Sequence, residues 1–161
     1  MSGGRPSPEQ RLGEIGIELP DPVPPFGEYV PVVRSGRQLW VGGHFGTRPD
    51  GTIHTGTVGA QVDADEARAA ARSAAVNLLS TVRTELGSLD LVEQVVHLSG
   101  AVNCTPDFTG QTGVIDAASE LLVAVLGDAG RHARLAVGVA ALPGDLVLEI
   151  EAVIDVRDGA G

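Results

Sequence analysis

Lysine is absent from this sequence of 161 residues, because all eleven basic residues are arginine. This absence excludes a lysine Schiff base, covalent attachment of pyridoxal phosphate and the phosphate-binding lysine of a P-loop. Cysteine is nearly absent as well, since Cys104 stands alone. A single cysteine can form neither an intrachain disulfide nor a thiolate cluster for zinc, so a reducing cytoplasm is the simplest compartment.

The histidines also lack the spacing that metal sites use. The four of them, at positions 44, 54, 97 and 132, form neither an HxH nor an HExxH pattern. We therefore expect no metal site and no cofactor, and we retain only His44 as a candidate pocket residue. The glycines near it lack the GxGxxG order and a following helix, so a dinucleotide site is not favoured either.

Positive charge is scarce, and long hydrophobic runs are missing. Eleven arginines stand against 21 acidic residues, which gives a formal net charge of −10. Such a charge repels nucleic-acid backbones and anionic membrane surfaces. No apolar run approaches the roughly 20 residues of a membrane span, and the opening MSGGRPSPEQ has no apolar core of a signal peptide. We expect a cytoplasmic protein that binds neither nucleic acid nor membrane.

Aromatic residues are few, with one Trp, one Tyr and three Phe in a chain that is 43% hydrophobic. We therefore expect one domain with an aliphatic core. The first 25 residues contain a tail, a short helix over 7–16 and most of the prolines of a proline-rich tether. This tether, in the stretch LPDPVPPFGEYVP, should run extended into the domain. The domain itself is predicted over 26–157, and residues 158–161 form a C-terminal tail.

The hydrophobic periodicity of the domain predicts the order β-β-α-β-α-β-β. YVPVVRSGRQLWVGGHF breaks at Ser35-Gly36 into two strands. Apolar residues at helical spacing predict helices over 63–87 and about 112–126, and alternation predicts a strand over about 92–104. The stretch RHARLAVGVAALPGDLVLEIEAVIDV then resembles a final hairpin. This order implies an α+β architecture with both helices packed on one face of a single sheet.

The final hairpin carries charges on one of its predicted faces. If its loop has an even number of residues, Arg134 shares a face with Glu149 and Glu151. Ala136 and Gly138 would leave room above that face, so a small anion could lie on it beside the guanidinium. The same residues also fit a solvated face on which the charges pair only with one another.

Both ends of the domain resemble one known family. GEYVPVVRSGRQLWVGG is similar to the N-terminal hairpin, and HARLAVGVAALPGDLVLEIEAV to the C-terminal signature, of the RidA (YjgF) family of reactive-intermediate imine deaminases. The residues of the second stretch are most similar to those of a less characterised branch labelled endoribonuclease-like (L-PSP). The resemblance implies a chorismate-mutase-like fold and a homotrimer with ligand pockets between its subunits.

The resemblance also implies roles for particular residues. Arg134 would hold the carboxylate of a 2-imino acid, and Glu149 would position or activate the attacking water. Tyr29 and the backbone N–H of Gly43 would complete the substrate pocket. A two-donor guanidinium suits a carboxylate, and one general base suffices for imine hydrolysis, so no cofactor is implied.

Several positions depart from the family pattern and leave the function open. Gly42 and His44 stand where members have Ser and Gln, and Leu135 replaces a small or polar residue. Ala136 stands where some members have Cys, and Ala117 falls near a position where members often have Asn. The first hypothesis is hydrolytic deamination of 2-imino or enamino acids to 2-keto acids and ammonia. The alternative is a trimeric module that binds small carboxylates without turnover. Ribonuclease activity is least favoured, because the chain lacks a cationic track.

Overall fold

The computed structural model describes residues 4–158 of the chain. The remaining residues of the predicted tails, 1–3 and 159–161, lie outside the described residues. The α-helices and strands are α1 (Pro8–Ile15), β1 (Val32–Ser35), β2 (Gln38–His44), α2 (Ala64–Leu86), β3 (Val92–Asn103), α3 (Gln111–Leu126), β4 (Ala133–Val139) and β5 (Leu148–Val156). Short 3₁₀ turns η1 (Leu89–Leu91), η2 (Gly127–Gly130) and η3 (Pro143–Asp145) join some of them.

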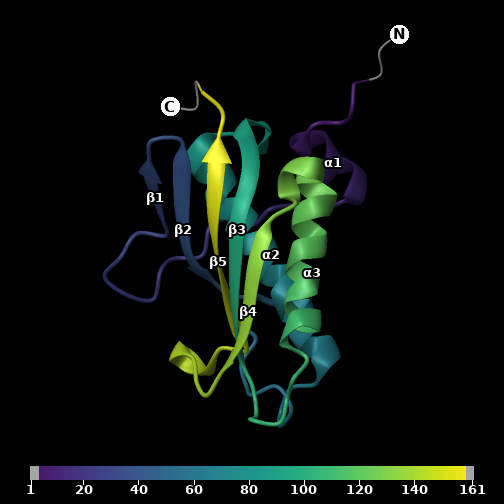
Figure 1. Cartoon of the computed structure of the whole chain (residues 1–161), viewed down its shortest axis with the longest axis vertical. Coiled ribbons are helices and arrows are strands. Elements are labelled where there is room, and N and C mark those ends of the chain that lie inside the picture. The colour runs from purple at the N-terminus through teal and green to yellow at the C-terminus, as the bar shows by residue number, and fades with distance from the viewer. Residues whose placement is uncertain (1–3, 159–161) are drawn as a thin grey trace.

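The five strands form one mixed sheet in the order β1-β2-β5-β3-β4. β3 and β4 are parallel and are joined by α3, whereas the other neighbouring strands are antiparallel. α2 and α3 cover one face of the sheet and leave the opposite face open (Figure 1). The predicted α+β fold, with its β-β-α-β-α-β-β order after the first helix, is therefore confirmed.

The predicted final hairpin is wrong, because β4 and β5 do not pair with each other. β5 lies between β2 and β3, and β4 lies on the far side of β3 at the edge of the sheet. A parallel β3–α3–β4 crossover places β4 next to β3, and β5 takes a central position where both its edges are paired. Because β4 pairs with β3 and not with β5, the side chains of β4 and β5 do not share faces in the way that the hairpin predicted.

Local sequence signals set the helix boundaries. Ser7 begins α1 with a capping box, and Gly16 ends it in a left-handed conformation with φ 71°. The Asp63 side chain accepts a hydrogen bond from the backbone of Glu66 at the start of α2. Gly87 ends α2 with φ 80°. The four predicted helix ends at these residues are thus confirmed, since each signal acts within one turn.

The core lies between the covered sheet face and the two long helices. Alanines on α2 and small residues on the sheet let the layers approach closely. At Gly100 on β3, an added Cβ would lie 2.6 Å from the Cδ1 of Ile115 on α3, so only glycine allows this contact. The largest fully buried side chains are Leu39, Leu78, Leu79, Leu89, Leu98, Ile115, Leu121, Leu122, Leu146, Leu148, Ile150 and Ile154.

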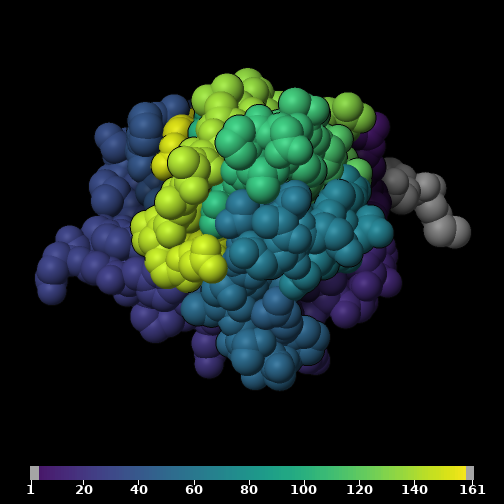
Figure 2. All heavy atoms as spheres, turned by 90° about the horizontal axis from the view of Figure 1, so that it is seen from below, coloured from purple at the N-terminus to yellow at the C-terminus, as the bar shows by residue number. Residues whose placement is uncertain are grey.

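Loops from distant parts of the chain meet at one end of the molecule. Seen from below, the segments around residues 50–60, 105–110 and 140–145 lie side by side (Figure 2). Bridges between Thr55 and Leu146 and between Val58 and Cys104 hold them together. Within residues 4–158, no helix is both long and apolar enough to cross a membrane.

Candidate functional site

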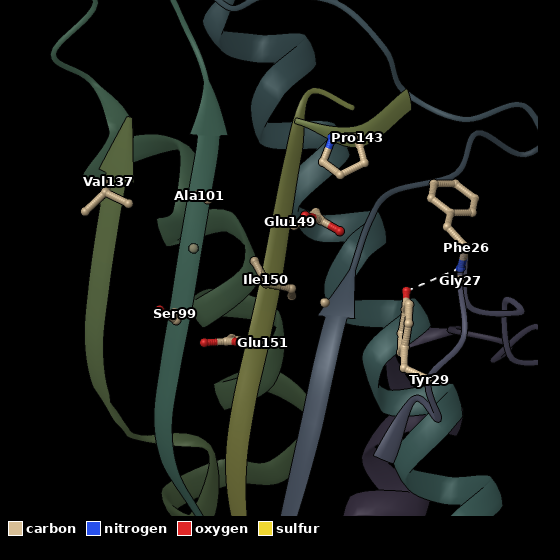
Figure 3. A pocket seen from close by; sticks show the side chains of 12 residues that line it. Phe26, Gly27, Tyr29, Ser99, Ala101, Val137, Pro143, Glu149, Ile150 and Glu151 are labelled. Atoms are coloured by element: carbon tan, nitrogen blue, oxygen red, sulfur yellow. Dashed lines mark hydrogen bonds between the residues drawn. The ribbon is translucent and has the colours of Figure 1, made fainter. Parts of the chain in front are cut away.

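A cavity of about 600 Å³ lies on the open face of the sheet. Its floor is formed by β5 and β3, with Val137 of β4 at one side and Gly43 of β2 at the other. Phe26, Tyr29 and Pro143 form a wall at the loop end (Figure 3). The cavity therefore joins residues from both ends of the sequence.

Glu149 lies on the floor of this cavity, and its side chain leans toward the loop that carries Phe26 and Tyr29 (Figure 3). Gly43 on the neighbouring strand makes room for it, since a Cβ at this position would lie 3.0 Å from the Glu149 Oε1. Burial, together with the charge of Glu151, raises the pKa of the Glu149 carboxyl. A carboxylate with a raised pKa in a cavity is suited to accept a proton from water.

A second carboxylate, Glu151, lies in the same cavity and leans over β3 toward Ser99 (Figure 3). The two glutamates share a face because they are two residues apart on one strand. None of the described residues that line the cavity is basic. In the single chain, the cavity therefore favours a neutral or cationic group near its floor. An anionic group could bind there only if a cation from outside this cavity balanced its charge.

The wall of the cavity is held in place by aromatic contacts. The Phe26 ring stacks on Phe45, with 4.6 Å between ring centroids and 21° between ring planes. The Tyr29 hydroxyl accepts a hydrogen bond of 3.3 Å from the backbone N–H of Phe26. These contacts link the end of the proline-rich segment to the body of the domain, and Tyr29 lines one cavity together with Glu149 and Gly43.

Arg134 lies on the opposite face, so the expectation that it shares a face with Glu149 and Glu151 is wrong. Across β3, Arg134 pairs with Leu98, whose side chain is buried under the helices, whereas Glu151 pairs with Ser99 on the open face. The cause of this difference is that β4 pairs with β3 and not with β5.

The guanidinium of Arg134 lies against α3. Its Nη1 donates hydrogen bonds to the Asp116 Oδ1 at 2.7 Å and to the Ser119 Oγ at 3.0 Å. Its Nη2 donates to the backbone carbonyl of Thr112 at 3.3 Å. These three bonds use at most three of the five N–H groups, so at least two are left for another acceptor.

Two other predicted pocket residues also lie on the helix side of the sheet. Ala136 pairs across β3 with Gly100, which contacts α3. The His44 side chain is buried, and its Nδ1 donates to the Gly42 carbonyl at 2.8 Å. Its Nε2 then accepts the hydroxyl proton of Thr81 on α2 at 2.8 Å. Burial lowers the His44 pKa, partly offset by the Gly42 carbonyl, so the ring is a neutral link between β2 and α2.

Several large apolar side chains are exposed on the open face beside the cavity. Trp40, Val33, Leu135 and Val137 are 55%, 53%, 52% and 40% exposed. Large contiguous apolar patches mark interaction surfaces in folded proteins. Leu135 and Val137 belong to this face, because they pair with Ser99 and Ala101 of β3, which line the cavity.

Replacing Gly43 with alanine should lower the activity at this cavity about tenfold, because the added Cβ displaces the Glu149 carboxylate by a fraction of an ångström. The melting temperature should stay near that of the wild type. Gly42→Ala is the matched control, since its Cβ would meet only the Pro31 carbonyl oxygen at 3.6 Å. If Gly43→Ala and Gly42→Ala lose the same activity, the loss does not come from displacement of the Glu149 carboxylate.

The sequence did not single out several residues that the structure brings to these two sites. Phe26, Ser99 and Pro143 line the cavity, and Asp116 and Ser119 hold Arg134. Ser99 carried a signal, because it alternates with buried residues on β3. The others depend on loop paths and on the rotation of α3, for which the local sequence holds no signal.

Comparison with family models identifies the relatives of this chain. The model described as "YjgF/chorismate mutase-like, putative endoribonuclease" matches residues 9–151. The chain belongs to the YjgF family. Protein TCP17 of Trypanosoma cruzi is 41% identical over 148 residues, which cover 91% of this chain and 92% of that protein.

Solved structures of the YjgF family share the fold. Atu1372 from Agrobacterium tumefaciens, a protein with unknown function, is 42% identical with a TM-score of 0.83, over 92% of this chain and 91% of that chain. A "putative endoribonuclease" from Shewanella oneidensis MR-1 is 29% identical with a TM-score of 0.89, over 94% and 100% of the two chains. RidA from the Antarctic bacterium Psychrobacter sp. PAMC 21119, at 24% identity and a TM-score of 0.58 over 84% and 94%, shares the fold. The predicted family and fold are confirmed.

Proposed function

We propose that this protein hydrolyses small 2-imino acids, and the enamino acids in equilibrium with them, to 2-keto acids and ammonia. The observation that carries the proposal is the position of Glu149 on the floor of a 600 Å³ cavity, with a raised pKa and with Gly43 and Tyr29 beside it. The resemblance of both ends of the domain to the reactive-intermediate imine deaminases supports the same reaction class.

The chemistry requires only a positioned water and one carboxylate. Glu149 takes a proton from water while the water oxygen bonds to C2 of the protonated imine and the C=N double bond becomes a single bond, which gives a neutral carbinolamine. Glu149 then gives this proton to the amine nitrogen, the C–N bond breaks to release ammonia, and the hydroxyl proton passes to solvent as the keto acid forms. Glu151 lies close enough to favour a cationic, protonated imine at the same floor. General base catalysis of this kind contributes about 10²–10⁴-fold.

A neighbouring copy completes this proposed site. The apolar open face around Trp40 and Leu135 favours packing against further copies, and a closed homotrimer is the arrangement that the family resemblance implies. β4 is an edge strand, so its Arg134 lies at the rim of its own chain. We propose that Arg134 of one copy reaches the Glu149 cavity of the next and binds the substrate carboxylate with its remaining N–H groups.

One observation favours a second candidate, a non-catalytic trimeric module that binds small carboxylates. His44, which stands where family members have Gln, is bonded to Thr81 and does not line the Glu149 cavity, and a binding module needs neither that side chain nor a catalytic contribution from Glu149. Ribonuclease activity is not proposed, although some relatives carry that name, because a chain of charge −10 with two glutamates in its cavity repels a phosphate backbone.

The test follows 2-aminoacrylate that a serine dehydratase releases in the same reaction. Pyruvate appears after a lag that reports the lifetime of the enamine and imine, and the wild-type protein should shorten this lag in proportion to its concentration. An unchanged lag would overturn the hydrolase. Binding of pyruvate by calorimetry together with an unchanged lag would instead support the binding module.

A further inference from the structure

A chain of hydrogen bonds runs from Arg134 through α3 to the turn before β4. Arg134 Nη1 lies 3.0 Å from the Ser119 Oγ, and that oxygen lies 2.9 Å from the His132 Nε2. His132 Nδ1 lies 2.6 Å from the carbonyl oxygen of Gly130. Three segments of the fold, α3, η2 and β4, therefore meet at one hydroxyl group.

The direction of each bond follows from the donors and acceptors available. The Gly130 carbonyl can only accept, so Nδ1 of His132 carries a proton. Burial keeps the pKa of His132 below its usual value; the Gly130 carbonyl opposes this shift, and the charges of Arg134 and His97 add to it. The neutral ring then offers a lone pair at Nε2. Ser119 donates its proton to this nitrogen and keeps its oxygen lone pairs for Arg134.

Arg134 is consequently held from two sides. Asp116 provides a charged acceptor at 2.7 Å, and its side chain is 46% exposed, so water weakens this ion pair. Ser119 is oriented by a ring that is itself fixed to the backbone, so its lone pair points in one direction. Linked hydrogen bonds of this kind strengthen one another. The hydroxyl therefore acts together with the Asp116 carboxylate and the Thr112 carbonyl to fix the plane of the guanidinium.

We infer that Ser119 and His132 are positioning residues for Arg134, which fix its guanidinium plane so that the remaining N–H groups present a two-donor edge to a ligand carboxylate. This inference rests on the proposed role of Arg134 in binding a carboxylate. It adds two residues that touch neither the substrate nor the reacting atoms.

Pyruvate is the probe of this positioning. Ser119→Ala should weaken pyruvate binding and raise KM about fivefold, because Arg134 loses one of the three acceptors that hold its guanidinium, while kcat stays within about twofold. His132→Ala should have the same effect, and the double variant should lose no more than either single variant, because both act through one chain of bonds. A fall in kcat with KM unchanged would overturn the positioning role.

Conservative variants separate positioning from folding. His132→Gln places an amide oxygen where it can accept the Ser119 proton, so it should restore most of the affinity that His132→Ala loses. Glu120→Gln is the matched control on the next residue of α3, since Glu120 pairs with Arg68 and not with Arg134. An affinity of His132→Gln as low as that of His132→Ala would contradict the inferred bond.

A readout without ligand keeps this test independent of the proposed function. In ¹⁵N spectra, the guanidinium signals of Arg134, identified by their loss in Arg134→Ala, should exchange with solvent several-fold faster in Ser119→Ala than in the wild type, because one hydrogen bond is lost. Equal exchange rates would overturn the inference. Faster exchange in a protein that neither binds pyruvate nor shortens the lag would leave the positioning of Arg134 supported and the proposed function refuted.

Discussion

Replacing Glu149 with glutamine should slow imine hydrolysis by about 10²–10⁴-fold, the contribution of a general base. Glutamine keeps the size of the side chain but cannot take the proton from water. Pyruvate binding should change little, because the proposed carboxylate contact is made by Arg134. The measurement is the lag before pyruvate appears, at several protein concentrations.

Asp155→Asn is the matched control for this variant. It removes a carboxylate from the same strand, β5, at a position opposite Gln38 and outside the residues that line the cavity. It should keep the wild-type rate. If Glu149→Gln remains as active as Asp155→Asn, Glu149 has no catalytic role.

The raised pKa of Glu149 also fixes the sign of two pH effects. The active form is ionised, so kcat/KM should rise with pH through a value above the ordinary 4.5 of a glutamate. In the folded single chain, ionising this carboxyl costs stability: the cost is absent below about pH 4.5 and grows as the pH rises through the raised pKa. Glu149→Gln should therefore melt no lower than the wild type at pH 7.

Mixed assemblies of two inactive variants should recover activity. Arg134→Ala keeps Glu149, and Glu149→Gln keeps Arg134, so a site shared between copies is intact wherever the right faces of the two variants meet. When equal amounts of the two chains are unfolded, mixed and refolded, random assembly of a closed ring gives about a quarter of the wild-type activity. Each variant alone should stay near the uncatalysed rate.

The control for this experiment refolds the two variants separately and mixes them afterwards, which yields no shared sites. Mass spectrometry of the intact assembly confirms that both chains are present in one particle. Mixed particles with no more activity than the parents would place Arg134 and Glu149 outside a common site. A single-chain mass by light scattering would contradict the shared cavity directly.

Much of the fold was predictable because its signals are local. Ser7 and Asp63 begin helices by accepting backbone protons within one turn, and Gly16 and Gly87 end them by adopting a conformation that is strained for other residues. The strand containing Glu149 was also predictable from its alternation. These features depend only on residues a few positions apart.

The pairing of strands was not predictable from the same signals. Alternation divides one strand into two faces but does not state which strand lies beside it, and consecutive strands most often pair as hairpins. The α3 crossover placed β4 beyond β3 instead. Arg134 consequently came to lie under α3, next to Asp116 and Ser119, rather than above Glu149.

The amino-acid sequence by itself determined the element types, the helix ends, the YjgF family and the acidic strand that carries Glu149. Each of these depends only on neighbouring residues or on a sequence motif. Only the tertiary structure decided that Glu149, Gly43 and Tyr29 share one cavity while Arg134 occupies the other face of the sheet. The physical reason is that strand order follows from long-range packing, in which the crossover through α3 takes β4 to the edge of the sheet and β5 is paired on both sides.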